Sequence, residues 1–113
     1  MTNQISFEGI GGDIATFHAE TGVQPGQVVK LTADSTVAPC AAGERFCGVA
    51  VNARDGLSAV QFGGFVRLAC ADESVTPGFV KLTADGSGGV KKATSGDEYL
   101  VVSTGDGALT VRI

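Results

Sequence analysis

The feature that most constrains the fold is a literal internal repeat. The pentapeptide Lys-Leu-Thr-Ala-Asp occupies residues 30–34 and again residues 81–85, and each copy follows a Pro-Gly pair. A Gly-acidic pair and an apolar run come after each copy, and each half closes on an Asp-Gly pair and a last apolar stretch. We therefore expect one supersecondary unit used twice, over about residues 23–62 and 75–113. Two copies favour a duplicated barrel or sandwich over a solenoid, which needs about three repeats or more.

The segments between the turn residues are typical of strands. They are rich in β-branched residues, and several alternate apolar with polar side chains; the strands expected on this basis cover residues 27–32, 46–51, 59–62, 65–69 and 109–113. Three Asp-Gly pairs, at 55–56, 85–86 and 106–107, favour hairpin turns because both residues tolerate positive φ. The chain holds 17 glycines and shows no sustained helical stripe after residue 22. We predict an all-β fold: a small β-barrel or β-sandwich built from two related halves.

Residues 1–22 differ from this body and are expected to form an extended N-terminal arm with a possible first strand, leaving residues 23–113 as a single β domain. Apolar residues recur along the arm, but glycines interrupt any regular element before residue 12; the apolar residues are Ile5, Phe7, Ile10, Ile14 and Phe17. A strand is favoured over residues 14–19, with a short helix capped by Asp13 as the alternative. An ordinary frayed terminus is the alternative for the part before residue 12.

Charge and hydropathy exclude several classes of partner. The formal net charge is −4, from 8 basic and 12 acidic residues, and the chain has no Lys/Arg stripe. Because binding to nucleic acid depends on neutralising several phosphates, we expect no direct nucleic-acid partner. No stretch approaches the roughly 20 apolar residues of a membrane span, and the first residues lack the basic and apolar regions of a signal peptide. We therefore expect no membrane partner, and synthesis and folding in the cytoplasm.

The inventory of chemically active groups is small. The single histidine, His18, has no Ser or Cys nucleophile in a recognisable signature near it. Cys40, Cys47 and Cys70 match no zinc or redox spacing, so buried inert thiols are expected, with one disulfide or a functional thiol as the alternative. We predict no catalytic residue, no cofactor-binding residue and no metal site. The protein is accordingly not expected to be an enzyme.

Two further groups of residues are expected to be structural. The acidic pairs at 72–73 and 97–98 are typical of turns, because adjacent residues of a strand point to opposite faces. The pair Lys91–Lys92 is expected at a sheet edge, where charge discourages aggregation. A modified lysine of the kind found in lipoyl-type carrier domains is the alternative for this pair.

Turn glycines and short apolar runs recur in a fixed order, at residues 25–29, 48–50, 64–68, 76–80 and 110–113. This order resembles that of the small capsid decoration (head cement) proteins of bacteriophages, over about residues 22–113. The acidic residue that follows each turn glycine in that family is replaced here by Gln27 and Phe79, and the three cysteines are not part of the family pattern.

The resemblance implies a structural virion protein that binds the outer surface of the capsid and stabilises it. The implied partner is the major capsid protein, the implied assembly is a homotrimer, and the implied location is the capsid exterior after synthesis in the host cytoplasm. The arm would lie on the capsid, docking through Ile5, Phe7 and Ile10, with Ile14 and Phe17 anchoring it to the body. A Gly-broken arm of this kind is expected to be mobile in the free protein and to order on contact. The alternatives are another virion β-module, such as a tail-tube or head–tail connector component, or a small-ligand-binding or carrier barrel.

Overall fold

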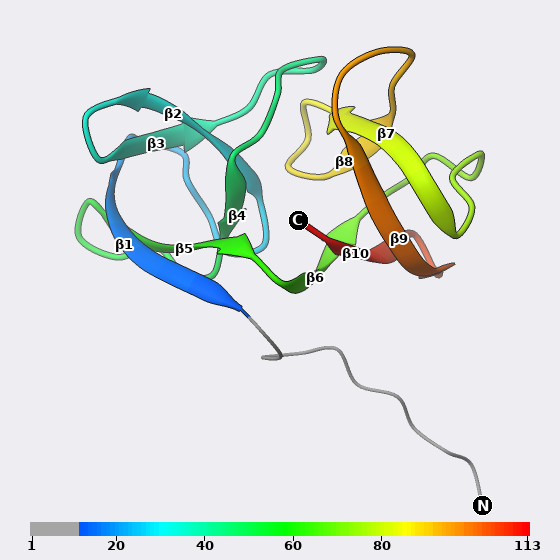
Figure 1. Cartoon of the computed structure of the whole chain (residues 1–113). Coiled ribbons are helices and arrows are strands. Elements are labelled where there is room, and N and C mark those ends of the chain that lie inside the picture. Colours follow the sequence, from blue (N-terminus) through cyan, green and yellow to red (C-terminus); the bar gives the residue numbers. More distant parts are fainter. Residues whose placement is uncertain (1–11) are drawn as a thin grey trace, which may run out of the picture.

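The computed structural model describes residues 12–113, and this part of the chain is all-β, with ten strands and no helix (Figure 1). The strands are β1 (Asp13–Ala19), β2 (Val28–Ala33), β3 (Thr36–Pro39), β4 (Gly48–Ala50), β5 (Leu57–Gly63), β6 (Phe65–Ala69), β7 (Gly78–Ala84), β8 (Val90–Lys92), β9 (Glu98–Gly105) and β10 (Ala108–Arg112). The first five close into a barrel in the order β1-β3-β2-β4-β5, and the other five form a sheet in the order β6-β10-β9-β7-β8. The predicted fold class is confirmed. In the described residues, no helix has the length and apolar character needed to cross a membrane.

The two halves share one strand order, which explains the repeated pentapeptide. Matching β1 to β6, β2 to β7, and so on through β5 to β10 converts the barrel order, read as β1-β5-β4-β2-β3, into the order of the second sheet. The two copies of the pentapeptide begin on the matched strands β2 and β7. Each repeated unit also includes the strand just before the one that carries the pentapeptide, which is β1 before β2 and β6 before β7. The strand expected over residues 14–19 is therefore β1, an integral strand of the barrel.

The halves differ in closure. In the barrel, β1 pairs with β5 along most of its length and in parallel with β3, where His18 lies opposite Thr36. Strand β3 was not expected from the sequence, because it is short and ends at Pro39. In the second half, the matched strands β6 and β8 stand at the two ends of the sheet. The second sheet is thus an opened version of the barrel.

Two hydrophobic cores result from the alternation of side chains along β2 and β4. Val29 and Ala50 point into the barrel and form its core with Val37 and Val60. The neighbouring residues Val28 and Val49 point out of the barrel and belong to a larger core; its other members include Leu68, Leu82, Val90, Val101, Leu109 and Val111 of the second half. The outer surface of the barrel therefore packs against the open second sheet, and the two halves share this larger core.

The loop between β3 and β4 holds the halves together. Lys30 binds both carboxylate oxygens of Glu44 at 2.8 Å, which ties the loop to β2. On its other side the loop pairs with β7: the amide of Gly43 donates to the carbonyl of Ala84 at 2.9 Å, and the amide of Ala84 donates to the carbonyl of Glu44 at 3.2 Å. The ring of Phe46 stacks on Tyr99 with centroids 5.1 Å apart. A segment of the first half is thus built into the second.

The Asp-Gly pairs form turns, as predicted, but not all of one type. Asp55 and Gly56, like Asp106 and Gly107, have positive φ at both positions, which fits two-residue hairpins. The pair that begins at Asp85 is different, because Asp85 does not adopt positive φ and the loop runs on to β8 at Val90. Its carboxylate accepts hydrogen bonds from the amides of residues 87 and 89, at 2.6 and 3.1 Å. The Asp85 side chain thus stabilises this longer loop by accepting hydrogen bonds from its amides, in place of the tight turn expected here.

Candidate docking surface

Of the five residues predicted to dock or anchor the arm, Ile5, Phe7 and Ile10 lie outside the described residues. Ile14 and Phe17 lie on β1, on opposite faces. Phe17 is half-buried, packs against the barrel core and meets the ring of Phe62 edge-on, with centroids 6.4 Å apart. The side chain of Ile14 is 56% exposed. The docking role of the arm residues stays a prediction.

A row of large side chains crosses the outer face of the second sheet. Phe79 on β7 lies opposite Leu100 on β9, Leu100 lies opposite Arg112 on β10, and Arg112 lies opposite Phe65 on β6. The side chain of Phe79 is 73% exposed, the highest value among the exposed large hydrophobic residues described. Aromatic side chains make large contributions to interfaces when they are buried there. This row is a candidate site for contact with another molecule.

The repeat shows why the exposure of Phe79 needs an explanation. Two residues before the pentapeptide, the first copy has Val28 and the second has Phe79. Val28 pairs with Val49, and both are buried against the second half. At the same place in the second half, Phe79 pairs with Leu100 and faces solvent. In the barrel, the outer face at this position makes the contact between the two halves. The second sheet repeats this outer face, but the described residues do not cover Phe79 there.

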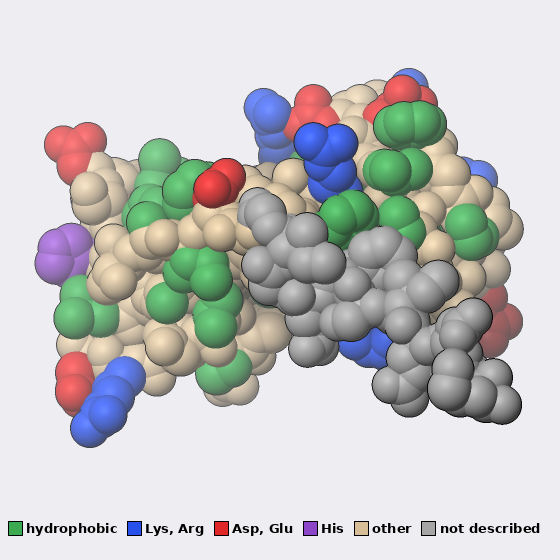
Figure 2. Space-filling model, turned by 60° about the horizontal axis from the view of Figure 1, so that its bottom comes forward, with side chains coloured by type: hydrophobic (Ala, Val, Ile, Leu, Met, Phe, Trp, Pro, Cys, Tyr) green, Lys and Arg blue, Asp and Glu red, His purple; other side chains and the backbone are tan. Residues whose placement is uncertain are grey.

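Basic residues lie within and beside this row. Arg67 and Arg112 are exposed, and Lys81 is exposed opposite Glu98. We define the docking face as the outer side of β6, β10, β9 and β7, carrying Phe65, Arg67, Phe79, Lys81, Glu98, Leu100 and Arg112. Three of these residues are basic and one is acidic, whereas the whole chain has a net charge of −4. Figure 2 shows hydrophobic side chains reaching the surface over both halves, with Lys and Arg side chains among them.

Sequence reasoning missed the docking face. The sequence predicts strands over residues 65–69 and 109–113 and an apolar run after the second pentapeptide, but it does not indicate the lateral order of these segments. In the sequence, Phe79 differs from the resembled family only in that it replaces an acidic residue. A signal was nonetheless present, because aligning the two copies puts a large aromatic residue at the position of the smaller Val28. Such a change favours a contact particular to the second half.

A hollow of about 560 Å³ lies at the junction of the halves. It is lined by Phe46, Phe62, Tyr99 and Ile113, with Cys47 and charged residues at its rim. The charges at the rim include an ion pair between Arg45 and Asp97, with 2.6 Å between Nε and Oδ2. Burial raises the pKa of the Tyr99 hydroxyl, so this group stays neutral at ordinary pH. Apolar and charged side chains therefore line the hollow together.

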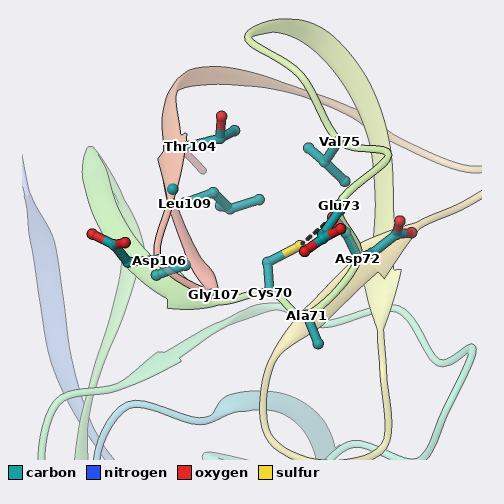
Figure 3. A pocket seen from close by; sticks show the side chains of 11 residues that line it. Cys70, Ala71, Asp72, Glu73, Val75, Thr104, Asp106, Gly107 and Leu109 are labelled. Carbon is teal, nitrogen blue, oxygen red and sulfur yellow. Dashed lines mark hydrogen bonds between the residues drawn. The ribbon is translucent and has the colours of Figure 1, made fainter.

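A second pocket, of about 240 Å³, lies between the β6–β7 loop and the β9–β10 hairpin (Figure 3). Asp72, Glu73 and Asp106 are among its lining residues; in this view the carboxylate of Glu73 lies beside Cys70, and that of Asp106 points away from it. The carboxylate of Asp72 already accepts hydrogen bonds from the side chain and amide of Ser74 and from the amide of Lys92, which lower its pKa. Within residues 12–113, no group of three or more His, Cys, Asp or Glu side chains is placed to hold a metal ion.

The other residues singled out in the sequence lie apart from these hollows. His18 is exposed on β1, opposite Leu57, and its amide donates to the carbonyl of Ser35 at 2.7 Å. The carboxylate of Glu20, a possible partner for an imidazole, instead accepts a hydrogen bond from the hydroxyl of Thr32. Lys91 and Lys92 lie on β8, at the end of the second sheet, as expected for a charged edge.

The three cysteines are free thiols, and their burial differs from the prediction at one position. Cys40 and Cys70 are buried, as expected, but Cys47 is exposed. The apolar run around Cys47 suggested burial, yet β4 begins only at residue 48, and it is the preceding Phe46 that points into the core. Burial raises the pKa of Cys40 to about 11. Partial desolvation also raises the pKa of Cys47 and Cys70 above the ordinary value of a thiol.

The difference in burial between Cys47 and the other two cysteines predicts the order in which the thiols react. In the native protein, a maleimide reagent is expected to label Cys47 first, because its side chain is exposed, while Cys40 and Cys70 react only when the fold opens. Because the thiolate is the nucleophile and the pKa of Cys47 is raised, labelling should keep accelerating above pH 9. Mass spectrometry of the time course would count the labels. Equal labelling of all three cysteines in the native protein would contradict the described burial.

No known family model matches the chain, and no curated protein matches it either. A function for this protein therefore has to be inferred from its own surface and from its motifs. The docking face is the strongest described feature for that purpose.

Proposed function

We propose that the protein is a bacteriophage capsid decoration protein, which binds the outer surface of the head through the docking face and the N-terminal arm. The observation that carries this proposal is the Phe79–Leu100 pair. It is apolar and paired across two strands, with Phe79 exposed and Leu100 partly buried, at the place where the matched pair in the barrel is buried against a protein surface. An exposed apolar side chain at such a position is typical of a site that binds another protein.

The chemistry around this pair fits the proposed partner, the major capsid protein. Interfaces commonly consist of a few buried anchors enclosed by polar and charged residues. Phe79 would be the anchor, and Arg67, Arg112 and Lys81 would form a basic rim suited to acidic residues on the capsid surface. The packed junction between barrel and sheet gives the rigid body that bracing neighbouring capsid subunits requires. We propose the homotrimer implied by the resemblance as the bound assembly.

The arm supplies the second contact in this proposal. Ile5, Phe7 and Ile10 would bind the capsid, and the half-buried ring of Phe17 would anchor the arm to the barrel. No catalytic group and no cofactor have a part in this function. A tail-tube or connector role would use the same docking face on a different partner, and separate binding to heads and tails distinguishes the two.

The role of Phe79 is testable in binding to heads. Phe79→Ala removes an exposed ring, so we expect an unchanged melting temperature but a loss of about 2 kcal/mol in binding, or about 30-fold in affinity. The measurement is titration of protein labelled at Cys47 against purified heads assembled without it. Leu31→Ala is the matched control, because Leu31 is also an exposed apolar residue but lies on the barrel. Equal affinity of the Phe79 variant and the control would contradict the proposed docking face.

A further inference from the structure

We propose that Arg67 and Arg112, together with the hydroxyls of Thr110 and Ser103, form a binding site for one doubly charged oxyanion, of the phosphate or sulfate type. The site lies on the outer face of the second sheet, where β6, β10 and β9 are neighbours. The inference concerns the free protein and does not rest on the proposed function.

The strand register brings these four side chains together. Arg67 on β6 lies opposite Thr110 on β10, and Thr110 lies opposite Ser103 on β9. Arg112 is two residues from Thr110 on the same strand, so it shares the face of Thr110 and is a diagonal neighbour of Arg67. Diagonal neighbours on a sheet are about 7–8 Å apart, which long side chains can span. Both guanidinium groups are therefore within reach of one small ligand beside the Thr110 hydroxyl.

The face that carries this group is the outer one. Val111, between Thr110 and Arg112, is buried in the core that the two halves share. Because side chains alternate along a strand, the residues on either side of Val111 point away from that core. Arg67, Arg112 and Ser103 are exposed, and Thr110 is half-buried. A ligand in solution can thus reach all four side chains.

No counter-charge for the two arginines is found among residues 12–113. The ion pairs of this part of the chain join Lys30 to Glu44, Arg45 to Asp97 and Arg54 to Asp55. The acidic residue of the docking face, Glu98, lies opposite Lys81. Neighbouring like charges on a sheet repel each other, and this pair occurs in a chain whose net charge is −4. Two adjacent cations without an internal partner indicate a bound anion.

The set of donors selects the class of anion. A guanidinium presents a planar fork of N–H donors, which suits bidentate binding of carboxylate or phosphate. Two such forks and two hydroxyls exceed the two oxygens and the single charge of a carboxylate. A phosphate or sulfate group has more acceptor oxygens and carries up to two negative charges, which match the two arginines. Because the chain is acidic and has no Lys/Arg stripe, a long polyanion does not fit, and the expected ligand is one small oxyanion.

Titration of the full-length chain with sodium sulfate, followed by NMR, tests the site. Sulfate is the probe because it keeps both charges at every pH used, and sodium chloride holds the ionic strength constant. We expect saturable shifts of the Nε–H signals of Arg67 and Arg112 and of the amide signal of Thr110. Acetate, with one charge and two oxygens, is expected to bind more weakly at the same ionic strength.

Substitution of either arginine separates a built site from general basic character. Arg67→Gln and Arg112→Gln each remove one exposed cation, so we expect about fivefold weaker sulfate binding or more, with an unchanged melting temperature. Lys81→Gln is the matched control, because Lys81 is also a basic residue of the docking face but lies opposite Glu98. The control should bind sulfate as the wild type does.

Each outcome decides the inference. Saturable binding that both arginine variants weaken and the Lys81 variant does not supports it. Shifts that never saturate overturn it, as does equal weakening by all three substitutions or equal affinity for acetate. Two further probes at pH 7.5 distinguish the sources of the anion: tighter binding of phenyl phosphate supports a site for monoesters, and tighter binding of inorganic phosphate supports a site for the free ion. Failure to bind heads would leave all of these results unaltered, so the two proposals fail separately.

Discussion

Replacing Leu82 by alanine is expected to lower the free energy of unfolding by about 2–5 kcal/mol, whereas the same change at Leu31 should alter it by less than about 0.5 kcal/mol. The two leucines occupy the same position in identical pentapeptides. Leu82 is only 4% exposed in the core shared by the halves, and Leu31 is 57% exposed at the barrel surface. Since local sequence and helix or strand propensity are the same at both sites, the difference isolates burial.

Equilibrium unfolding in urea measures this contrast. The midpoint should fall strongly for Leu82→Ala and stay near that of the wild type for Leu31→Ala, with similar slopes. Because typical domains are stable by only about 5–15 kcal/mol, the Leu82 variant could lose much of its stability at 37 °C. Equal losses at the two positions would show that the halves bury their copies alike, and would contradict the shared core described here.

The second large effect is expected at Gly89. An alanine Cβ at this position would lie 2.3 Å from the carbonyl oxygen of Ala69 and 3.0 Å from the carboxylate of Asp85. Since the closest contact is with backbone, β6 would have to move away from the loop before β8. We expect Gly89→Ala to lower the free energy of unfolding by about 3 kcal/mol, at the upper end of overpacking effects. Thermal unfolding followed by circular dichroism would measure the loss.

Gly12→Ala is the matched control for this substitution. Neither glycine has positive φ, so the two variants differ in space and not in backbone strain. At Gly12 the nearest atom to an added Cβ is Nε2 of Gln61, at an ordinary contact distance of 3.4 Å. The control should unfold within a few degrees of the wild type. A mild effect at Gly89 equal to that at Gly12 would mean that the loop before β8 does not lie against β6 as described.

Much of the fold could be predicted because it depends on local signals. β-branched runs, the repeated pentapeptide and the Asp-Gly pairs at 55–56 and 106–107 correctly indicated strands, duplication and tight turns. The parallel pairing of β1 with β3 could not be predicted, because it joins segments whose contact leaves no local pattern. The burial of Leu82 and the exposure of Leu31 could not be predicted for the same reason. Residues of the first half complete the core around Leu82 but not around Leu31, and no local pattern indicates that contact.

The candidate site was less predictable than the fold. The arm residues were chosen for their apolar character, and the structure describes Ile14 and Phe17 alone among them. The docking face depends on the register of four strands, which brings Phe79, Leu100 and Arg112 into one row from distant parts of the chain. Its basic character is also invisible in the composition, because the overall net charge is −4. Lateral strand order is the information that sequence reasoning lacked.

We propose that this protein binds the outside of a phage head, and this binding can be measured directly. The most direct measurement is cosedimentation of the purified protein with phage heads assembled without it and, in parallel, with purified tails of the same phage. We predict saturable binding to heads, in a fixed ratio to major capsid protein, and none to tails. Binding confined to tails, or absent from both particles, would contradict the proposed function.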